Sequence, residues 1–199
     1  MKVVLFSILA YVLGSVPFGL LVARVKGVNI REVGSGNIGA TNVFRSIGKG
    51  AGIFTFGCDF LKGFIPAFVF VKFVGNTNFG LLFGTLAILG HNFPVFLKFK
   101  GGKGVATSAG MLAGVAGQAV LWGLGTWLVV FLASGFVSLA SILAALIIGI
   151  VGWLVPDYTL IKSVILTVLA VLAIYRHKTN IQRLLKGEES RFNLWKKKK

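Results

Sequence analysis

Apolar runs close to 20 residues long alternate along this chain with short polar segments. The run 3–23 carries no charge between Lys2 and Arg24, and the run 79–97 carries none either. A helix of about 20 residues crosses the roughly 30 Å hydrocarbon layer of a membrane. The pattern therefore predicts transmembrane helices. We expect the first run to remain as a span, because it is too long for a cleaved signal peptide and no small-residue cleavage site precedes Arg24.

The middle of the chain is harder to divide, because residues 104–156 include no charged side chain over 53 positions. We divide this stretch into three short crossings with breaks near 121–125 and 134–136, each of about 17 residues, the low end for a span. Treating it as one crossing plus surface segments leaves five spans, and this alternative stays open. The fold class expected is an all-α membrane protein of about seven helices. Its spans are at about 3–23, 51–72, 79–97, three within 104–156, and 160–175.

Composition and charge agree with a membrane protein. The 199 residues are 56% hydrophobic and 13% charged, with a mean hydropathy of +0.88, which is too apolar for a soluble domain. Of the 21 Lys and Arg residues, five lie in 24–49, three in 98–103 and nine in 176–199. Cytoplasmic loops hold such an excess, so we expect the N-terminus outside and the C-terminus inside. The formal charge of +16 follows from this bias and does not indicate nucleic-acid binding.

We expect one domain over 1–199 with a basic tail at about 187–199. The final lysines, 196–199, are either a solvated tail resting on anionic lipid or an addition to the natural chain. A single cysteine excludes an intrachain disulfide. The few carboxylates leave little for a metal site, so we expect no metal and no cofactor. The acidic residues are Glu32, Asp59, Asp157, Glu188 and Glu189.

Three polar segments carry the candidate chemistry, and the first is glycine-rich. Its GxGxxG spacing does not indicate a dinucleotide fold, because that motif needs a preceding strand, and apolar spans flank it here. Small residues let backbone N–H groups approach an anion, and hydroxyl and amide side chains add donors. The alternative is a flexible loop without a ligand. The candidate residues are Gly34, Ser35, Gly36, Asn37, Gly39, Thr41, Asn42 and Arg45.

The second segment is a Gly-Gly-Lys-Gly sequence that opens an apolar helix, an arrangement that suits a phosphate. It is not a Walker A loop, because Leu97 stands where that motif needs Gly and Gly104 where it needs Ser or Thr. The alternative to phosphate binding is that Lys103 is an ordinary cytoplasmic lysine. We interpret Lys98 and Lys100 as membrane-facing anchors. The candidate binding residues are His91, Gly101, Gly102, Lys103 and Gly104.

The third segment closes the last span. If the helix continues, Arg176, Asn180 and Arg183 share one face beside His177, which suits a second anion. A basic anchor at the end of the span is the competing interpretation.

Two further features lie inside spans. Asp59 and Lys62, at i and i+3 in an apolar helix, suggest mutual charge pairing that supports the first loop or acts in catalysis. Ser138 and Ser141 share a helix face, a pattern that is also common in helix packing.

Together the segments GSGNIGATN, GHNFPVFLKFKGGKGVAT, VSLASI and YRHKTNIQRLLKG, in this order over about residues 11–192, resemble the bacterial acyl-phosphate:glycerol-3-phosphate acyltransferase family. The resemblance implies a seven-helix enzyme of the bacterial cytoplasmic membrane, active at its cytoplasmic face. It also implies lysophosphatidic acid as product, from acyl phosphate and glycerol 3-phosphate, with other phospholipid-synthesis enzymes as candidate partners. Mapped family residues are Ser35, Asn37, Arg45, His91, Lys103, Ser141, His177 and Asn180.

We assign catalysis to the residues that suit charge stabilisation or proton handling, namely Ser35, Arg45, Lys103, His177 and Asn180. The other candidates, Arg176, Arg183 and Ser141 included, we assign to substrate binding. An acyl phosphate has a good leaving group, so the reaction needs cations and donors more than acids. The proton acceptor is either a histidine or a substrate phosphate. An organic-phosphate transporter and a CDP-alcohol phosphotransferase are the alternatives, which would need a midplane site or several aspartates.

Overall fold

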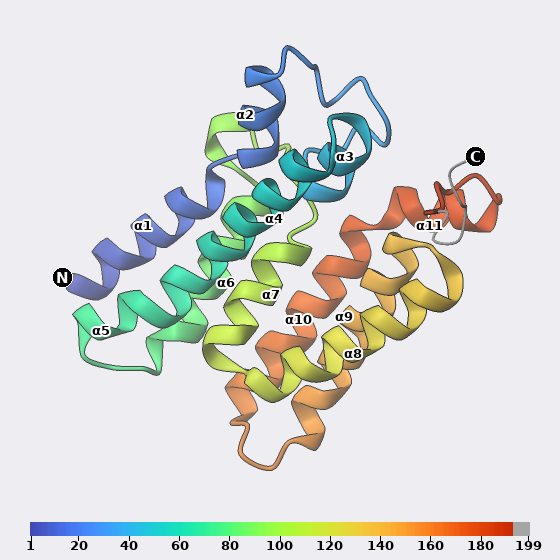
Figure 1. The fold of residues 1–199 in the computed structure, drawn as a ribbon. Helices are drawn as coiled ribbons and strands as arrows, with labels where there is room; N and C mark the ends of the chain where they lie inside the picture. Colours follow the sequence, from blue (N-terminus) through green and yellow to red (C-terminus); the bar gives the residue numbers. More distant parts are fainter. Residues whose placement is uncertain (193–199) are drawn as a thin grey trace. The chain divides into compact units, whose positions relative to one another are not determined.

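The computed structural model describes residues 1–192, in which the regular secondary structure is helical, without a β-strand (Figure 1). The chain forms two compact units, Met1–Ala116 and Gly117–Lys199. Each unit is a set of packed helices whose outer faces carry large apolar side chains, as a lipid-facing surface requires. The expected all-α membrane class is confirmed.

Unit 1 begins with a broken span. α1 (Lys2–Ser15) and α2 (Phe18–Val25) meet at an angle of 40°. Pro17 separates them, and a proline pushes the residue before it out of the helical region, as the ψ of 117° at Val16 shows. The apolar run 3–23 is therefore two helices, where the sequence pattern predicted one uninterrupted span.

The second span agrees with its predicted limits of about 51–72. It is made of α4 (Lys49–Phe64), a π-helical turn η1 (Ile65–Val69) and α5 (Phe70–Val74). Pro66 lies at the start of η1, where its missing N–H accounts for the local change in hydrogen bonding. The short α3 (Ala40–Ser46) precedes this span and packs against α4.

The rest of unit 1 is α6 (Phe79–Asn92), a 3₁₀ turn η2 (Val95–Leu97) and α7 (Val105–Val115). α1 packs against α6, and α4 packs against α7. Both contacts use glycine for close approach: a Cβ on Gly14 would lie 2.1 Å from the Ala87 carbonyl oxygen, and one on Gly63 would lie 2.0 Å from that of Thr107. These contacts hold α6 against α1 and α7 against α4.

Unit 2 consists of α8 (Gly117–Ser134), α9 (Val137–Leu154), α10 (Leu160–Arg176) and the short α11 (Lys178–Leu185). The predicted break near 121–125 is wrong, because α8 is continuous there and the chain breaks at Ala116 instead. Gly123 serves helix packing, since a Cβ there would lie 2.6 Å from Ile148. The second predicted break, near 134–136, is confirmed by Gly135 with a φ of +72°.

Four helical segments within residues 1–192 are long and apolar enough to span a membrane. Counting each bent pair, α1–α2 and α10–α11, as one span gives up to six. α7 is a shorter apolar helix of 11 residues, which corresponds to roughly 16 Å.

Candidate functional site

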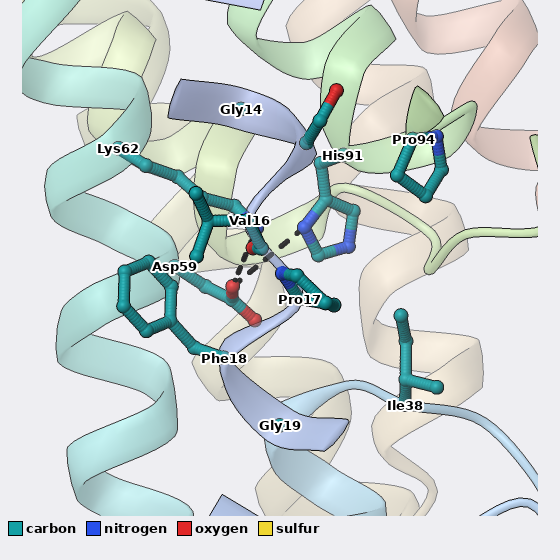
Figure 2. Close-up of a pocket in the computed structure, with 11 residues that line it drawn as sticks. Gly14, Val16, Pro17, Phe18, Gly19, Ile38, Asp59, Lys62, His91 and Pro94 are labelled. Atoms are coloured by element: carbon teal, nitrogen blue, oxygen red, sulfur yellow. Dashed lines mark hydrogen bonds and ion pairs between the residues drawn. The ribbon is translucent and has the colours of Figure 1, made fainter. Parts of the chain in front are cut away.

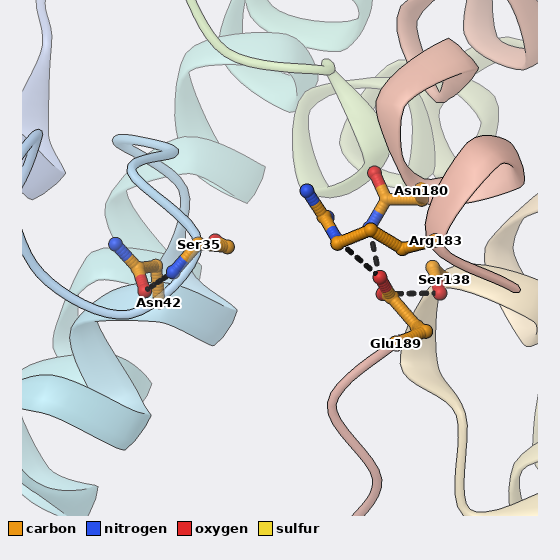
Figure 3. A network of polar contacts seen from close by, with 6 residues as sticks. All are labelled: Ser35, Asn42, Ser138, Asn180, Arg183 and Glu189. Atoms are coloured by element: carbon orange, nitrogen blue, oxygen red, sulfur yellow. Dashed lines mark hydrogen bonds and ion pairs between the residues drawn. The ribbon is translucent and has the colours of Figure 1, made fainter. Parts of the chain in front are cut away.

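The loop before α3 is organised by one buried side chain, Asn42, which is 2% exposed (Figure 3). Its amide nitrogen donates to the carbonyl oxygens of Ile30, Val33 and Asn37, at 3.1, 3.0 and 2.9 Å. Its Oδ1 accepts from the backbone N–H of Ser35 at 2.9 Å. These hydrogen bonds of Asn42, which is also predicted as a substrate contact, set the shape of its own loop.

Two glycines let this loop close around Asn42. Gly34 and Gly36 have φ of +59° and +69°, which favours residues without a Cβ. A Cβ on Gly34 would also lie 2.2 Å from Asn42 Oδ1. The loop thereby holds the side chain of Ser35 exposed, while Arg45, in the last turn of α3, is half-buried.

The Gly-Gly-Lys-Gly segment lies against the end of α6. The N–H groups of Gly101 and Gly102 donate to the carbonyl oxygens of Asn92 and His91, at 3.2 and 3.1 Å. A Cβ on Gly102 would lie 2.2 Å from His91 Nε2. These glycines are therefore required by packing inside the protein, whatever they do for a ligand. Two of the amide donors predicted for phosphate are already used here.

Lys103 follows directly and is half-buried, immediately before Gly104, the N-cap of α7. Gly104 has a φ of +79°, and α7 begins without a side-chain cap. The first N–H groups of a helix have no partner within the helix and favour an anion. The geometry leaves Lys103 and the first turn of α7 as the part of this segment suited to phosphate.

A buried ion pair supports both segments from inside unit 1 (Figure 2). Lys62 Nζ lies 2.8 Å from Asp59 Oδ1 and donates to the Val16 carbonyl oxygen at 2.9 Å. His91 Nδ1 is 3.7 Å from the same carboxylate oxygen. Both charged residues are 2% exposed, so the predicted pairing is confirmed. The space around them also meets Ile38 and has no room for a water molecule, which indicates a supporting role.

In unit 2 the chain bends by 55° at His177. The His177 N–H donates to the carbonyl of Ile174, while its Nδ1 lies 2.8 Å from the carbonyl oxygen of Ala173. The imidazole thus replaces the backbone N–H that a continuing helix would supply. The prediction that one helix carries Arg176, Asn180 and Arg183 on a single face is wrong, because the helix ends at Arg176. A carbonyl can only accept, so Nδ1 carries the proton.

Glu189 is the residue that sequence reasoning missed (Figure 3). Its carboxylate accepts from Ser138 Oγ, Asn180 Nδ2 and Arg183 Nε, at 2.6, 2.7 and 2.7 Å. Burial alone would raise the pKa of Glu189, but these hydrogen bonds and the charge of Arg183 outweigh it and hold the pKa below its ordinary value. Asn180 and Arg183, predicted for an anionic substrate, bind this internal anion.

Residues 187–192 were expected to belong to a basic tail, and two contacts tie this part to unit 2. One is the Glu189 cluster, and the other is the Phe192 N–H, which donates to the Gly135 carbonyl at 2.9 Å. The rest of the predicted tail, residues 193–199, lies outside the described residues. Ser141, predicted to bind substrate, accepts from Trp127 Nε1 at 3.2 Å and donates to the Val137 carbonyl.

The described residues thus bring the first two predicted segments to one end of unit 1. Ile38 and His91 line the same small pocket, and Arg31 donates to the Lys100 carbonyl at 2.8 Å. Within 1–192 no three His, Cys, Asp or Glu side chains are grouped to hold a metal ion. These features define an α-helical membrane protein in which two basic, glycine-rich segments lie at one end of unit 1.

Comparisons with known proteins identify the family. Residues 4–187 match the family described as glycerol-3-phosphate acyltransferase. The chain is 48% identical over 193 residues to the glycerol-3-phosphate acyltransferase of Aquifex aeolicus, covering 96% of this chain and all of that one. It is 41% identical to glycerol-3-phosphate acyltransferase 2 of Thermotoga maritima, covering 97% and 98%.

Solved structures agree. The glycerol 3-phosphate form of PlsY (YgiH), an integral membrane glycerol 3-phosphate acyltransferase, matches with a TM-score of 0.91 and 44% identity, over 97% of this chain and 96% of that one. Its lysophosphatidic acid form matches with a TM-score of 0.87 and 43% identity over the same shares. This chain belongs to the glycerol-3-phosphate acyltransferase family.

Proposed function

We propose that this protein transfers an acyl group from acyl phosphate to the 1-hydroxyl of glycerol 3-phosphate, giving lysophosphatidic acid and phosphate. Besides the family, the observation that carries the proposal is in unit 1. There the Asn42-organised loop and the Lys103 segment lie at one end, held from inside by the Asp59–Lys62 pair. Such a set of donors and cations suits a phosphate monoester.

The chemistry of an acyl phosphate fits the residues available. The hydroxyl oxygen of glycerol 3-phosphate attacks the acyl carbon, and the bond from that carbon to the phosphate oxygen breaks. Phosphate leaves with the electron pair and needs no protonation by an acid. The chain has five acidic residues, two of which, Asp59 and Glu189, are paired internally. Cations and oriented donors must therefore supply the catalysis, and positioning alone is worth several kcal/mol.

We assign roles within each unit. In unit 1, Arg45 and Lys103 neutralise phosphate charge and Ser35 donates from the exposed loop. In unit 2, His177 carries a proton on Nδ1, and in the neutral imidazole Nε2 accepts a hydrogen bond from the glycerol hydroxyl. The hydroxyl proton passes to a phosphate oxygen of the substrate. Asn180 takes part from the Glu189 cluster, where its amide is held at 2.7 Å.

The remaining candidates bind or position the substrates in this proposal. They are Gly34, Gly36, Asn37, Gly39, Thr41, Asn42, His91, Gly101, Gly102, Gly104, Ser141, Arg176 and Arg183.

We further propose that residues 1–199 work as one domain that crosses the bacterial cytoplasmic membrane seven times. The N-terminus is outside, and the site faces the cytoplasm. The bias of Lys and Arg supports this orientation. The seven crossings are the α1–α2 pair, α4–α5, α6, α7, α8, α9 and the α10–α11 pair. Because α7 is short, it crosses where the bilayer is locally thin or where its ends lie in a water-filled recess of the protein.

The direct test uses purified protein with glycerol 3-phosphate and either palmitoyl phosphate or palmitoyl-CoA. We expect turnover with the phosphate, none with the thioester, and competitive inhibition by a non-hydrolysable acyl phosphonate. Comparable transfer from palmitoyl-CoA, with the phosphonate inert, would refute the proposed donor. Phosphate transport without acyl transfer would favour the transporter, and strict Mg²⁺ dependence would favour the phosphotransferase.

A further inference from the structure

A basic cleft of about 860 Å³ opens in unit 1 beside the segments described above. Its walls come from the end of α2 with the turn that follows, and from η2 with the residues after it. Four cationic side chains line it, and none of them belongs to the site proposed for the reaction. They are Arg24, Arg31, Lys98 and Lys100.

The positive charge of this cleft is not neutralised by the protein. No carboxylate is among its lining residues, although Glu32 follows Arg31 in the chain. In the part of the chain that the structure describes, none of these four cations forms an ion pair. The Arg31 guanidinium donates a hydrogen bond to the Lys100 carbonyl, and this contact joins the two walls. The cleft is therefore built to accept negative charge.

The same cleft is also apolar. Leu20 and Phe96 contribute to its lining, and Phe96 is 59% exposed. Its two walls lie at the ends of two candidate spans, the α1–α2 pair and Phe79–Leu97, which places it where hydrocarbon gives way to water. An occupant must combine an anionic group with an alkyl portion.

The backbone conformation at the rim of the cleft also points to a ligand-binding site. Lys98 and the adjacent Phe99 have φ of +50° and +62°, a conformation that residues with a Cβ rarely adopt. Strain of this kind costs on the order of 1–3 kcal/mol per residue and tends to occur at ligand-binding positions. Here it turns the chain so that Lys98 lines the cleft.

We propose that the cleft binds one anionic phospholipid of the membrane. Its headgroup phosphate lies among Arg24, Lys98 and Lys100, and its acyl chain runs along Leu20 and Phe96. The proposal rests on the membrane class of the protein and on the charge of the cleft, and it stands or falls separately from the acyl donor. The bound lipid is a site ligand, in contrast to the general attraction expected for exposed lysines.

The test compares phosphatidylglycerol with phosphatidylcholine of the same chains, by native mass spectrometry of the full-length protein in detergent. The cleft variant is Arg24→Gln, Lys98→Gln and Lys100→Gln, with Arg31 kept because it joins the walls. The matched control removes three exposed cations that do not line the cleft: Lys26→Gln, Lys49→Gln and Lys186→Gln. Thermal unfolding and acyltransferase rates in detergent monitor the fold of both variants.

We expect the wild type and the control to bind phosphatidylglycerol at least about tenfold more tightly than phosphatidylcholine, and the cleft variant to lose this preference. Equal preference in the cleft variant and the control would overturn the proposal, since net charge would then explain the binding. Displacement of the lipid by millimolar inorganic phosphate would also overturn it, because the site would then be one for a free anion. If the cleft variant unfolds, Arg24→Gln alone must give a measurable loss of preference.

Discussion

The buried pair Asp59–Lys62 gives the sharpest test of how the protein is held together. Lys62 Nζ forms an ion pair with Asp59 Oδ1 at 2.8 Å and donates to the Val16 carbonyl at 2.9 Å, with the Phe18 ring 5.7 Å away. Replacing Asp59 by Asn leaves a 2%-exposed ammonium without its counter-charge. Removing one partner of a buried pair costs about 3–5 kcal/mol.

The expected loss is large enough to measure directly. For a protein near 200 residues, this cost corresponds to a fall in Tm of roughly 6–20 °C. Asp59→Asn should show it by circular dichroism in detergent. The double variant Asp59→Leu with Lys62→Met should recover most of the loss, because apolar replacement of both partners is often neutral. Asp157→Asn, which changes an exposed carboxylate, is the matched control.

Activity distinguishes support from catalysis. His91 Nδ1 lies 3.7 Å from Asp59, and Gly102 rests on the same imidazole, so the pair positions the Lys103 segment. The stability-restored double variant Asp59→Leu/Lys62→Met should therefore keep kcat within a few-fold of the wild type. If a kinetic constant changes, it should be a higher KM for a phosphorylated substrate. An unchanged Tm in Asp59→Asn together with a lost kcat would refute this reasoning and make the carboxylate catalytic.

Three other predictions concern the site. Lys103→Ala and Arg45→Ala should each lower kcat/KM, measured by lysophosphatidic acid formation, by an amount that corresponds to about 2–4 kcal/mol of lost transition-state stabilisation. The kcat/KM of Lys98→Ala should stay within a few-fold of the wild-type value. Equal losses at Lys98 and Lys103 would mean that bulk charge was measured. Activity should persist in excess EDTA without added divalent cations, and strict dependence on them would contradict the cation-based mechanism. Because Glu189 has a lowered pKa, its stabilisation is present above the ordinary value of about 4.3 and lost as pH falls below it, so Tm should drop there in the wild type but not in Glu189→Gln.

The local features of this protein could be predicted from sequence. The pairing of Asp59 with Lys62 follows from their i, i+3 spacing in an apolar helix, and the limits of the second span follow from hydropathy. The break at Ala116 could not be placed, because Gly123 and Gly125 read equally well as packing residues or as a turn. Helix packing decides between these, and it depends on contacts such as that with Ile148.

Long-range pairing explains what was missed at the third segment. Glu189 meets Ser138 across 51 positions of sequence, and no periodicity connects them. From sequence, Asn180 and Arg183 had no visible internal anion, so a ligand was the natural inference. The structure shows that the protein supplies a carboxylate itself. A substrate phosphate at these donors would have to compete with Glu189, so the proposed roles of Asn180 in catalysis and Arg183 in binding depend on orientation as much as on charge.

The Gly-Gly-Lys-Gly segment shows how one sequence pattern can have two physical causes. By sequence, a Gly102→Val variant tests a phosphate cradle, since it removes backbone access and leaves Lys103 in place. In the structure the new Cβ would meet His91 Nε2 at 2.2 Å, so the variant would displace the imidazole beside Asp59 whether or not phosphate binds. Loss of activity at Gly102 therefore cannot separate a cradle from a packing contact. A substitution at Lys103 can separate the two, because it removes the ammonium without placing an atom against His91.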